Sequence, residues 1–188
     1  MSFENYCQTV VKNFEAMSAL EEVMDNAAEI WVQALKRGNK IIFCGNGGSA
    51  SDSQHLAAEL VGRYIIERDS LPSIALTVDT SALTAIANDY GYDQVFARQL
   101  SGLGKSGDVF VGITTSGNSA NIVAAVEVAK RMGITVMGFT GQGGGKLADA
   151  CDLCIKVPSD TTNHIQEMHI AVGHYLCGVT EIRLRDEA

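Results

Sequence analysis

The chain opens with apolar residues at helical spacing. Between residues 3 and 17 they recur every three or four positions, which predicts an amphipathic helix. A second stripe between residues 20 and 35 predicts another helix, and Ser18 and Glu21 in front of it have the spacing of a capping box. We therefore expect residues 1–37 to form a helical hairpin. Its apolar surface exceeds what one domain covers, so we also expect it to contribute to oligomer packing.

From Lys40 the pattern changes to short apolar runs, each followed by a turn rich in Gly, Ser or Thr and then by a helical pattern. The five runs are residues 40–44, 73–77, 108–113, 135–140 and 152–158. Nearly continuous apolar strands separated by helices are typical of a parallel sheet covered on both faces. The sequence predicts one α/β domain over residues 1–188, with a doubly wound, five-stranded parallel sheet flanked by helices.

The turn after the third run, TTSGNS, combines four hydroxyls with a glycine and carries no charge. The hydroxyls belong to Thr114, Thr115, Ser116 and Ser119. Free backbone N–H groups at the start of a helix attract anions, and glycine lets the backbone approach a ligand closely. Capping the next helix would need only one of these side chains. The loop therefore favours phosphate binding over simple capping.

A second small-residue turn, CGNGGSAS, follows the first run. Its glycines miss the G-x-G-x-x-G register of dinucleotide sites because position 50 is alanine, and the chain has no G-x-x-x-x-G-K-[ST] loop. The turn fits better as a loop that approaches one small ligand. Both turns are expected at the carboxyl ends of the strands, where open parallel sheets bind ligands.

Behind this turn, His55 and Glu59 stand at i and i+4 on one helix face. Such a pair can hold a divalent metal or a substrate proton, but it is also common on solvated helix surfaces. The spacing alone leaves both interpretations open.

The last helical segment carries three of the four histidines of the chain. Gln166 and His174 lie outside its apolar stripe and are eight positions apart, about 12 Å along a helix. They can act together only if long side chains converge or if different subunits supply them. We expect His164 and His169 to face solvent on this amphipathic helix.

Composition narrows the function classes. The net charge of −8 and the pI near 4.9 disfavour a nucleic-acid partner. No apolar run approaches the roughly 18 residues of a membrane span, and the first residues lack a signal-peptide pattern. We expect a cytoplasmic protein without a membrane partner. The five cysteines, including the C-x-x-C pair Cys151 and Cys154, are expected to be reduced core residues.

Four separated motifs resemble the phosphosugar-binding SIS (sugar isomerase) domain, and more closely the phosphoheptose isomerase family. They are GITTSGNS, CGNGGSASDSQHLAAELVGRY, TAIANDYG and HIQEMHIAVGH. The resemblance covers nearly the whole chain. It implies the SIS fold and a homotetramer with active sites at subunit interfaces. The implied reaction converts sedoheptulose 7-phosphate to D-glycero-D-manno-heptose 7-phosphate, which supplies heptose for lipopolysaccharide or another surface glycan.

The same resemblance implies roles for individual residues. Glu59 and His174 match the family's proposed base and acid. A zinc ion, one per subunit, is implied at His55, Glu59, Gln166 and His174. Sugar-phosphate contacts are implied for Asn46, Gly47, Gly48, Glu59, Asn88, Asp89, Thr114, Thr115, Ser116, Ser119 and Gln166.

Three positions depart from the family pattern. Thr114 stands where serine is usual, which keeps the hydroxyl. His164 replaces an arginine, and Asn163 replaces the aspartate of some relatives, so this chain has no carboxylate at position 163.

Two other functions remain open. Some SIS relatives without isomerase activity are scaffolds for a replication initiator, but those lack the residues that match Glu59 and His174. An isomerase of another sugar phosphate would keep the phosphate loop and change the pocket wall.

Overall fold

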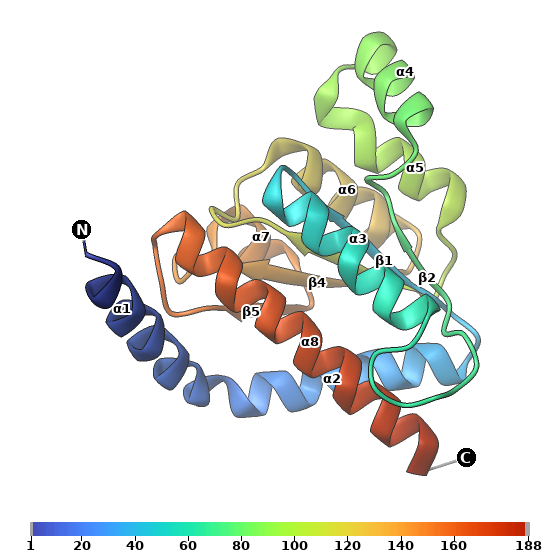
Figure 1. The fold of residues 1–188 in the computed structure, drawn as a ribbon. Coiled ribbons are helices and arrows are strands. Elements are labelled where there is room, and N and C mark those ends of the chain that lie inside the picture. Colours follow the sequence, from blue (N-terminus) through green and yellow to red (C-terminus); the bar gives the residue numbers. More distant parts are fainter. Residues whose placement is uncertain (1, 187–188) are drawn as a thin grey trace.

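A five-stranded parallel sheet forms the centre of the computed structural model, which describes residues 2–186 (Figure 1). The strands are β1 (Ile41–Gly45), β2 (Ser73–Ala75), β3 (Val109–Ile113), β4 (Thr135–Thr140) and β5 (Leu153–Lys156). Their order is β2-β1-β3-β4-β5, and all neighbours are parallel. The predicted doubly wound sheet is confirmed. The strand order reverses between β1 and β3, which is where ligands bind in such sheets.

Helices cover both faces of this sheet. They are α1 (Phe3–Ala16), η1 (Met17–Leu20), α2 (Glu21–Lys36), α3 (Gly48–Val61), α4 (Thr80–Tyr90), η2 (Tyr92–Gln94), α5 (Val95–Leu103), α6 (Ala120–Arg131), α7 (Gly145–Ala150) and α8 (Thr162–Asp186). Helices α2, α3 and α8 share one core with the sheet, and α5, α6 and α7 share the other. Successive residues of a strand, such as Phe43 and Cys44, enter opposite cores because side chains alternate across a strand.

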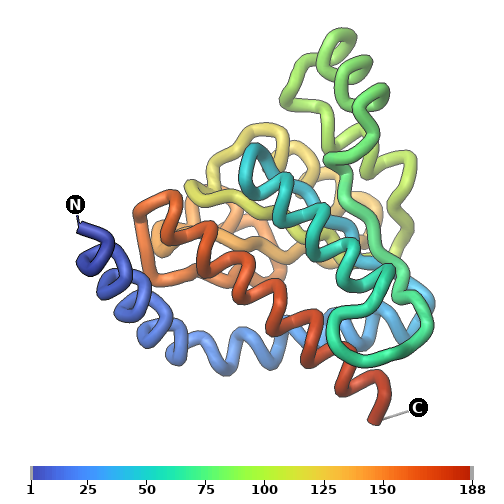
Figure 2. The backbone as a smooth tube through the Cα atoms, in the orientation of Figure 1, coloured from blue at the N-terminus to red at the C-terminus, as the bar shows by residue number. Residues whose placement is uncertain are grey.

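The two N-terminal helices form one bent arm where a hairpin was expected (Figure 2). Helix α1 passes through the single turn η1 directly into α2, so the chain bends without folding back on itself. Ser18 donates a hydrogen bond to the Glu15 carbonyl, 2.8 Å away, and the N-cap residue of α2 is Leu20. The predicted capping box is therefore absent, because a short 3₁₀ turn continues the helical path.

Only the second half of this arm is packed into the core. Trp31 of α2 is fully buried, whereas α1 has no buried residue. Phe3, Val11 and Phe14 expose 81%, 56% and 40% of their surface. The Tyr6 hydroxyl donates to the Glu167 carboxylate, which ties α1 to the start of α8.

The two histidines expected in solvent are buried. His169 is fully buried beside Phe139, with ring centroids 6.0 Å apart. His164 is also buried, and its Nδ1 lies 2.9 Å from Glu167 Oε2. The expectation was wrong because α8 contacts α1, α2, α3 and β4, so its covered surface is wider than its apolar stripe.

The expectation for the cysteines holds only in part. All five are free thiols, but only Cys44 and Cys177 are buried. Cys7 is exposed, and the pair Cys151 and Cys154 is partly exposed.

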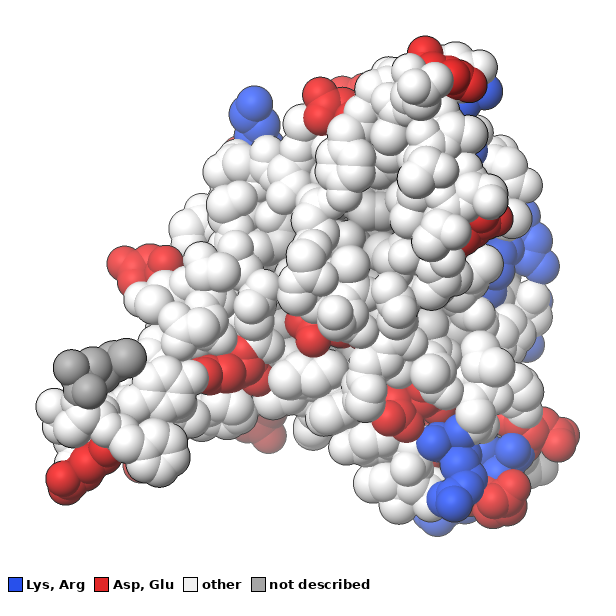
Figure 3. Space-filling model, turned by 45° about the horizontal axis from the view of Figure 1, so that its top comes forward, with Lys and Arg blue, Asp and Glu red and all other residues white. Residues whose placement is uncertain are grey.

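The surface gives two further observations. None of the helices within residues 2–186 has the length and apolar character needed to cross a membrane. On the face drawn in Figure 3, acidic and basic side chains are scattered, and neither forms a continuous patch.

The buried His169 predicts a specific pH dependence of stability. Burial lowers its pKa from 6.5 to about 4, so the unfolded chain binds a proton at pH values where the folded chain does not. Its contribution is complete above about pH 6.5 and is lost as the pH falls toward 4, a difference of about 3 kcal/mol. Urea unfolding at several pH values measures it. His169→Gln should flatten the dependence in this window, and an unchanged slope would contradict the assignment.

Candidate active site

Helices α3 and α8 lie side by side and come unusually close at one point. Gly173 of α8 faces Leu56 of α3, and a Cβ added at Gly173 would lie 2.4 Å from both Leu56 methyl carbons. Leu56 is fully buried and has little room to move. Glycine at position 173 therefore sets the separation of the two helices.

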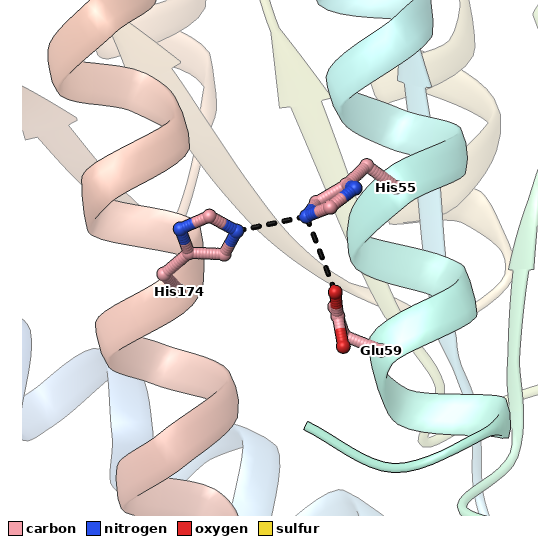
Figure 4. Close-up of side chains that lie close together, drawn as sticks. All are labelled: His55, Glu59 and His174. Atoms are coloured by element: carbon pink, nitrogen blue, oxygen red, sulfur yellow. Dashed lines mark hydrogen bonds and ion pairs between the residues drawn. The ribbon is translucent and has the colours of Figure 1, made fainter. Parts of the chain in front are cut away.

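This approach brings together His55, Glu59 and His174 (Figure 4). His55 Nε2 lies 2.8 Å from His174 Nε2 and 3.2 Å from Glu59 Oε1. The side chains point toward one another across the space between α3 and α8. His55 and Glu59 expose 49% and 21% of their side chains, so a ligand can reach the cluster from solvent.

The donor atoms of this cluster suit a divalent metal. Two imidazole nitrogens and a carboxylate oxygen lie within 4.8 Å of one another. Zinc prefers nitrogen donors of this kind together with carboxylate oxygen, and catalytic zinc sites commonly use three protein ligands. Three of the four residues expected as metal ligands are thus gathered in one place.

Gln166, the fourth expected ligand, lies elsewhere along the helix pair. A Cβ added at Gly48, the first residue of α3, would lie 2.7 Å from Gln166 Nε2. At 1.5 Å rise per residue, His55 is about 10 Å and Glu59 about 16 Å further along α3. Gln166 therefore belongs to the loop end of the site, beside Gly47 and Gly48.

The expected phosphate loop joins β3 to α6 at the carboxyl edge of the sheet. The hydroxyls of Thr114 and Ser119 are 2.9 Å apart, with Thr115 and Ser116 between them. Ser119 is the N-cap residue of α6, yet its side chain makes no capping hydrogen bond. The hydroxyls are therefore not consumed by helix capping, which favours the ligand-binding interpretation of this loop.

Gly117 holds this loop in place. Its φ is +68°, and a Cβ there would lie 1.9 Å from the Gly144 carbonyl oxygen. The Leu147 amide also donates to the Gly117 carbonyl at 2.9 Å. Only glycine fits this conformation and contact, so the turn before α7 fixes the shape of the loop.

The loop after β1 is linked to the phosphate loop by side chains. Asn46 exchanges hydrogen bonds of 3.0 and 2.8 Å with Asn121 of α6, and Tyr92 donates to Asn46 at 3.1 Å. Asn121 and Tyr92 were not expected at the site. Asn121 could have been found, because it is a polar residue in the first turn of the helix that follows TTSGNS.

Asn88 and Asp89 are not brought to these loops within the described chain. They lie exposed at the end of α4, which projects from the body of the molecule (Figure 1), and Asn88 Nδ2 donates to Asp89 Oδ1 at 2.8 Å. Their predicted contact with a sugar phosphate stays a prediction.

Comparison with known proteins decides the family. The SIS domain family model matches residues 5–141. The phosphoheptose isomerase of Akkermansia muciniphila is 57% identical over 172 residues, covering 92% of this chain and 91% of that protein. That of Rhodospirillum rubrum is 54% identical over 176 residues, with 94% of each chain covered. The chain belongs to the SIS-domain phosphoheptose isomerase family.

Solved structures of this family share the fold. The phosphoheptose isomerase GmhA of Neisseria gonorrhoeae has a TM-score of 0.89 at 44% identity, with 95% of this chain and 96% of that chain covered. A phosphoheptose isomerase of Francisella tularensis has a TM-score of 0.91 at 38% identity, with 94% and 95% covered. The SIS fold expected from the sequence motifs is confirmed.

The close approach at Gly173 predicts a costly substitution. Gly173→Ala should lower the free energy of unfolding by about 1–3 kcal/mol, because the added methyl overpacks a buried contact. Urea unfolding measures the change. The matched control is Gly102→Ala in α5, where an added Cβ meets no atom within 4 Å. Equal stability of the two variants would contradict the close packing.

Proposed function

We propose that this chain is an aldose–ketose isomerase that converts sedoheptulose 7-phosphate to D-glycero-D-manno-heptose 7-phosphate. The observation that carries the proposal is the convergence of Glu59 and His174 in a chain of the phosphoheptose isomerase family. A carboxylate and an imidazole are the side chains most often used to move protons at carbon next to a carbonyl.

The reaction needs two proton movements on carbon. Glu59 takes a proton from C1 of the ketose, which gives an enediol-like intermediate. His174 supplies the proton that C2 gains, while the hydroxyl proton passes from the C1 oxygen to the C2 oxygen. The carbonyl thereby moves from C2 to C1 with no net change in atoms, and proton exchange with solvent returns Glu59 and His174 to their starting states. Positioned acid and base groups typically contribute about 10²–10⁴ in rate.

We include one zinc ion per subunit in this proposal. His55, Glu59 and His174 would hold it. The family resemblance implies Gln166 as a further ligand, but within this chain Gln166 lies beside Gly48, about 10 Å along α3 from His55. A bound zinc ion would polarise the sugar carbonyl. Coordination would make Glu59 a weaker base, because zinc would withdraw electron density from the carboxylate. Metal binding and proton abstraction by Glu59 would therefore oppose each other.

The loop end of the site supports binding of the sugar phosphate. The hydroxyls of Thr114, Thr115, Ser116 and Ser119 lie in the loop directly before α6, and the start of a helix attracts anions without a lysine. Asn46, Gly47, Gly48 and Gln166 lie at the neighbouring loop and are proposed to contact the sugar. Asn88 and Asp89 are proposed to complete these contacts in the assembled protein.

The distance between the two groups of site residues supports an active site shared between subunits. The backbone of Glu59 lies about 16 Å along α3 from that of Gly48, so the acid–base pair and the loops occupy opposite ends of this helix. The exposed apolar face of α1 offers a surface for subunit packing. We therefore propose a homo-oligomer, a tetramer as the family resemblance implies, in which one subunit supplies the loops and another the acid–base pair.

The alternative functions receive less support. A scaffold for a replication initiator would have no use for the pairing of Glu59 with His174. Another sugar phosphate as substrate would leave the relationship to phosphoheptose isomerases of 50–57% identity unexplained. Supply of heptose to lipopolysaccharide or another surface glycan, in the cytoplasm, completes the proposal.

Removal of either proton-transfer group should abolish most turnover. Glu59→Gln and His174→Gln should each lower kcat for sedoheptulose 7-phosphate by about 10²–10⁴, measured as aldose formation with and without added zinc. Glu67→Gln is the matched control, since that carboxylate is 90% exposed. Near-normal rates in both variants would refute the mechanism, and no product from the wild type under either condition would favour the scaffold.

A shared site predicts complementation between inactive chains. One chain carries Glu59→Gln and the other carries Ser116→Ala with Ser119→Ala, and mixed oligomers are purified through two different tags. Activity should reappear in the mixed oligomers, because some sites combine an intact loop with an intact Glu59. Mixed oligomers as inactive as either parent would place each complete site within one chain.

A further inference from the structure

The segment after α3 lies against the second half of α8, next to the catalytic cluster. Tyr64 of this segment stacks on the His174 ring, with centroids 5.4 Å apart and planes at 21°. His55 meets the same ring at 5.0 Å and 63°. The imidazole of His174 is therefore held on one face by Tyr64 and on another side by His55.

Glu181, two turns beyond His174, fixes the segment that carries Tyr64. Its buried carboxylate accepts hydrogen bonds from three successive backbone amides, those of Tyr64 (2.7 Å), Ile65 (2.9 Å) and Ile66 (3.0 Å). Arg68 donates a hydrogen bond from Nε at 3.0 Å, and its Nη2 forms an ion pair with the same carboxylate oxygen at 2.9 Å. Burial opposes ionisation, but the three amides and Arg68 outweigh it and hold the pKa of Glu181 below its usual value.

Arg68 ties the same ion pair to α3. Its Nη2 donates to the Glu59 carbonyl oxygen at 2.9 Å, and its Nη1 donates to the Leu60 carbonyl oxygen at 2.9 Å. These carbonyls belong to the last turn of α3, where an arginine can satisfy acceptors that lack helical partners. One ion pair thus holds the Tyr64 segment and the turn that carries Glu59.

Gly178 provides the space for the tyrosine ring. A Cβ added there would lie 3.3 Å from Tyr64 Cε1 and 3.5 Å from Cδ1. His174, Gly178 and Glu181 follow at i, i+4 and i+7, so they share one face of α8. Along this face, His174 is followed by Gly178, which leaves room for the Tyr64 ring, and then by Glu181, which binds the segment that carries Tyr64.

We propose that Tyr64 and Glu181 are positioning residues for His174. Glu181 with Arg68 fixes the segment, and the Tyr64 ring keeps the His174 imidazole turned toward His55 and Glu59. The catalytic consequence rests on the proposed isomerase function, whereas the orientation of the ring does not. A buried ion pair contributes little net stability compared with apolar packing, so positioning accounts for its presence better than stability does.

The sharpest test is Gly178→Ala. The added methyl crowds the Tyr64 ring, which must shift by a few tenths of an ångström, while alanine favours the helix, so folding is preserved. We expect kcat to fall severalfold, by up to about tenfold, with a much smaller change in KM, because this shift is smaller than the ~1 Å misplacement that can cost about a hundredfold. Gly102→Ala, which adds the same methyl to α5 without a contact, should leave kcat unchanged.

Variants of Tyr64 and Glu181 test whether the fall in kcat depends on the stacked tyrosine ring. Tyr64→Phe keeps the stacked ring and should keep kcat, whereas Tyr64→Leu should lower it like Gly178→Ala. Glu181→Gln removes the charge that binds three amides and should act in the same direction. If Glu181→Gln does not fold, Gly178→Ala and the Tyr64 pair still decide the question.

A spectroscopic readout distinguishes this proposal from the isomerase function. The ring-proton NMR signals of His174, assigned through His174→Gln, should carry a ring-current shift that Tyr64→Leu and Gly178→Ala reduce and Tyr64→Phe retains. Unchanged His174 signals in both disruptive variants would overturn the positioning. Shifted signals with unchanged kcat would overturn its catalytic role. A wild type without isomerase activity would refute the proposed function and leave the NMR test valid.

Discussion

The site depends on how closely two helices can approach. Helix α3 follows β1 and α8 follows β5, and the sheet places both on the same face. Gly173 removes the side chain that would keep them apart, and Leu56 fills the contact. His55 and His174 are the immediate neighbours of these two residues in sequence, so the same contact brings their rings within hydrogen-bonding distance. The contact between Gly173 and Leu56 therefore determines both the packing of the two helices and the closeness of the two histidines.

The polar groups at the two ends of the site are held in place in different ways. The loop end has backbone amides and hydroxyls, and rigid turns such as that at Gly117 hold them in place. The helix end has ionisable side chains that other side chains must hold, since imidazoles rotate freely unless something packs against them. The Glu181–Arg68 pair and the Tyr64 ring meet that need. In the proposed function, the fixed dipoles of the loops would bind the unreactive phosphate, and the supported side chains of the helices would move protons.

Much of the fold was predictable because strands and turns are local. The five apolar runs became β1 to β5, and the small-residue turns fell at their carboxyl ends. The bend at η1 was not predictable, since the apolar spacing is the same for a hairpin and a bent arm. His169 was misplaced because helical periodicity was judged from apolar residues alone, and a neutral histidine can be buried among them.

Some residues of the candidate site were also predictable from the sequence, and others were not. His55 and Glu59 were recognisable from their i, i+4 spacing, and the hydroxyl loop from its composition. The pairing with His174 needed either the family resemblance or the structure. The bond between Arg68 and Glu181 joins residues 113 positions apart, and neither lies in a motif that indicates a partner. Long-range pairs between single charged residues leave no periodic pattern in a sequence.

The arm formed by α1 has a consequence for how the protein completes its own folding. A lone helix of 14 residues is marginal in water, and α1 buries no residue against its own chain. Within the chain, the Tyr6–Glu167 hydrogen bond supports α1, while Phe3, Val11 and Phe14 stay exposed. If the proposed oligomer covers these side chains, dilution would reduce the order of α1 and leave the packed core of the domain intact.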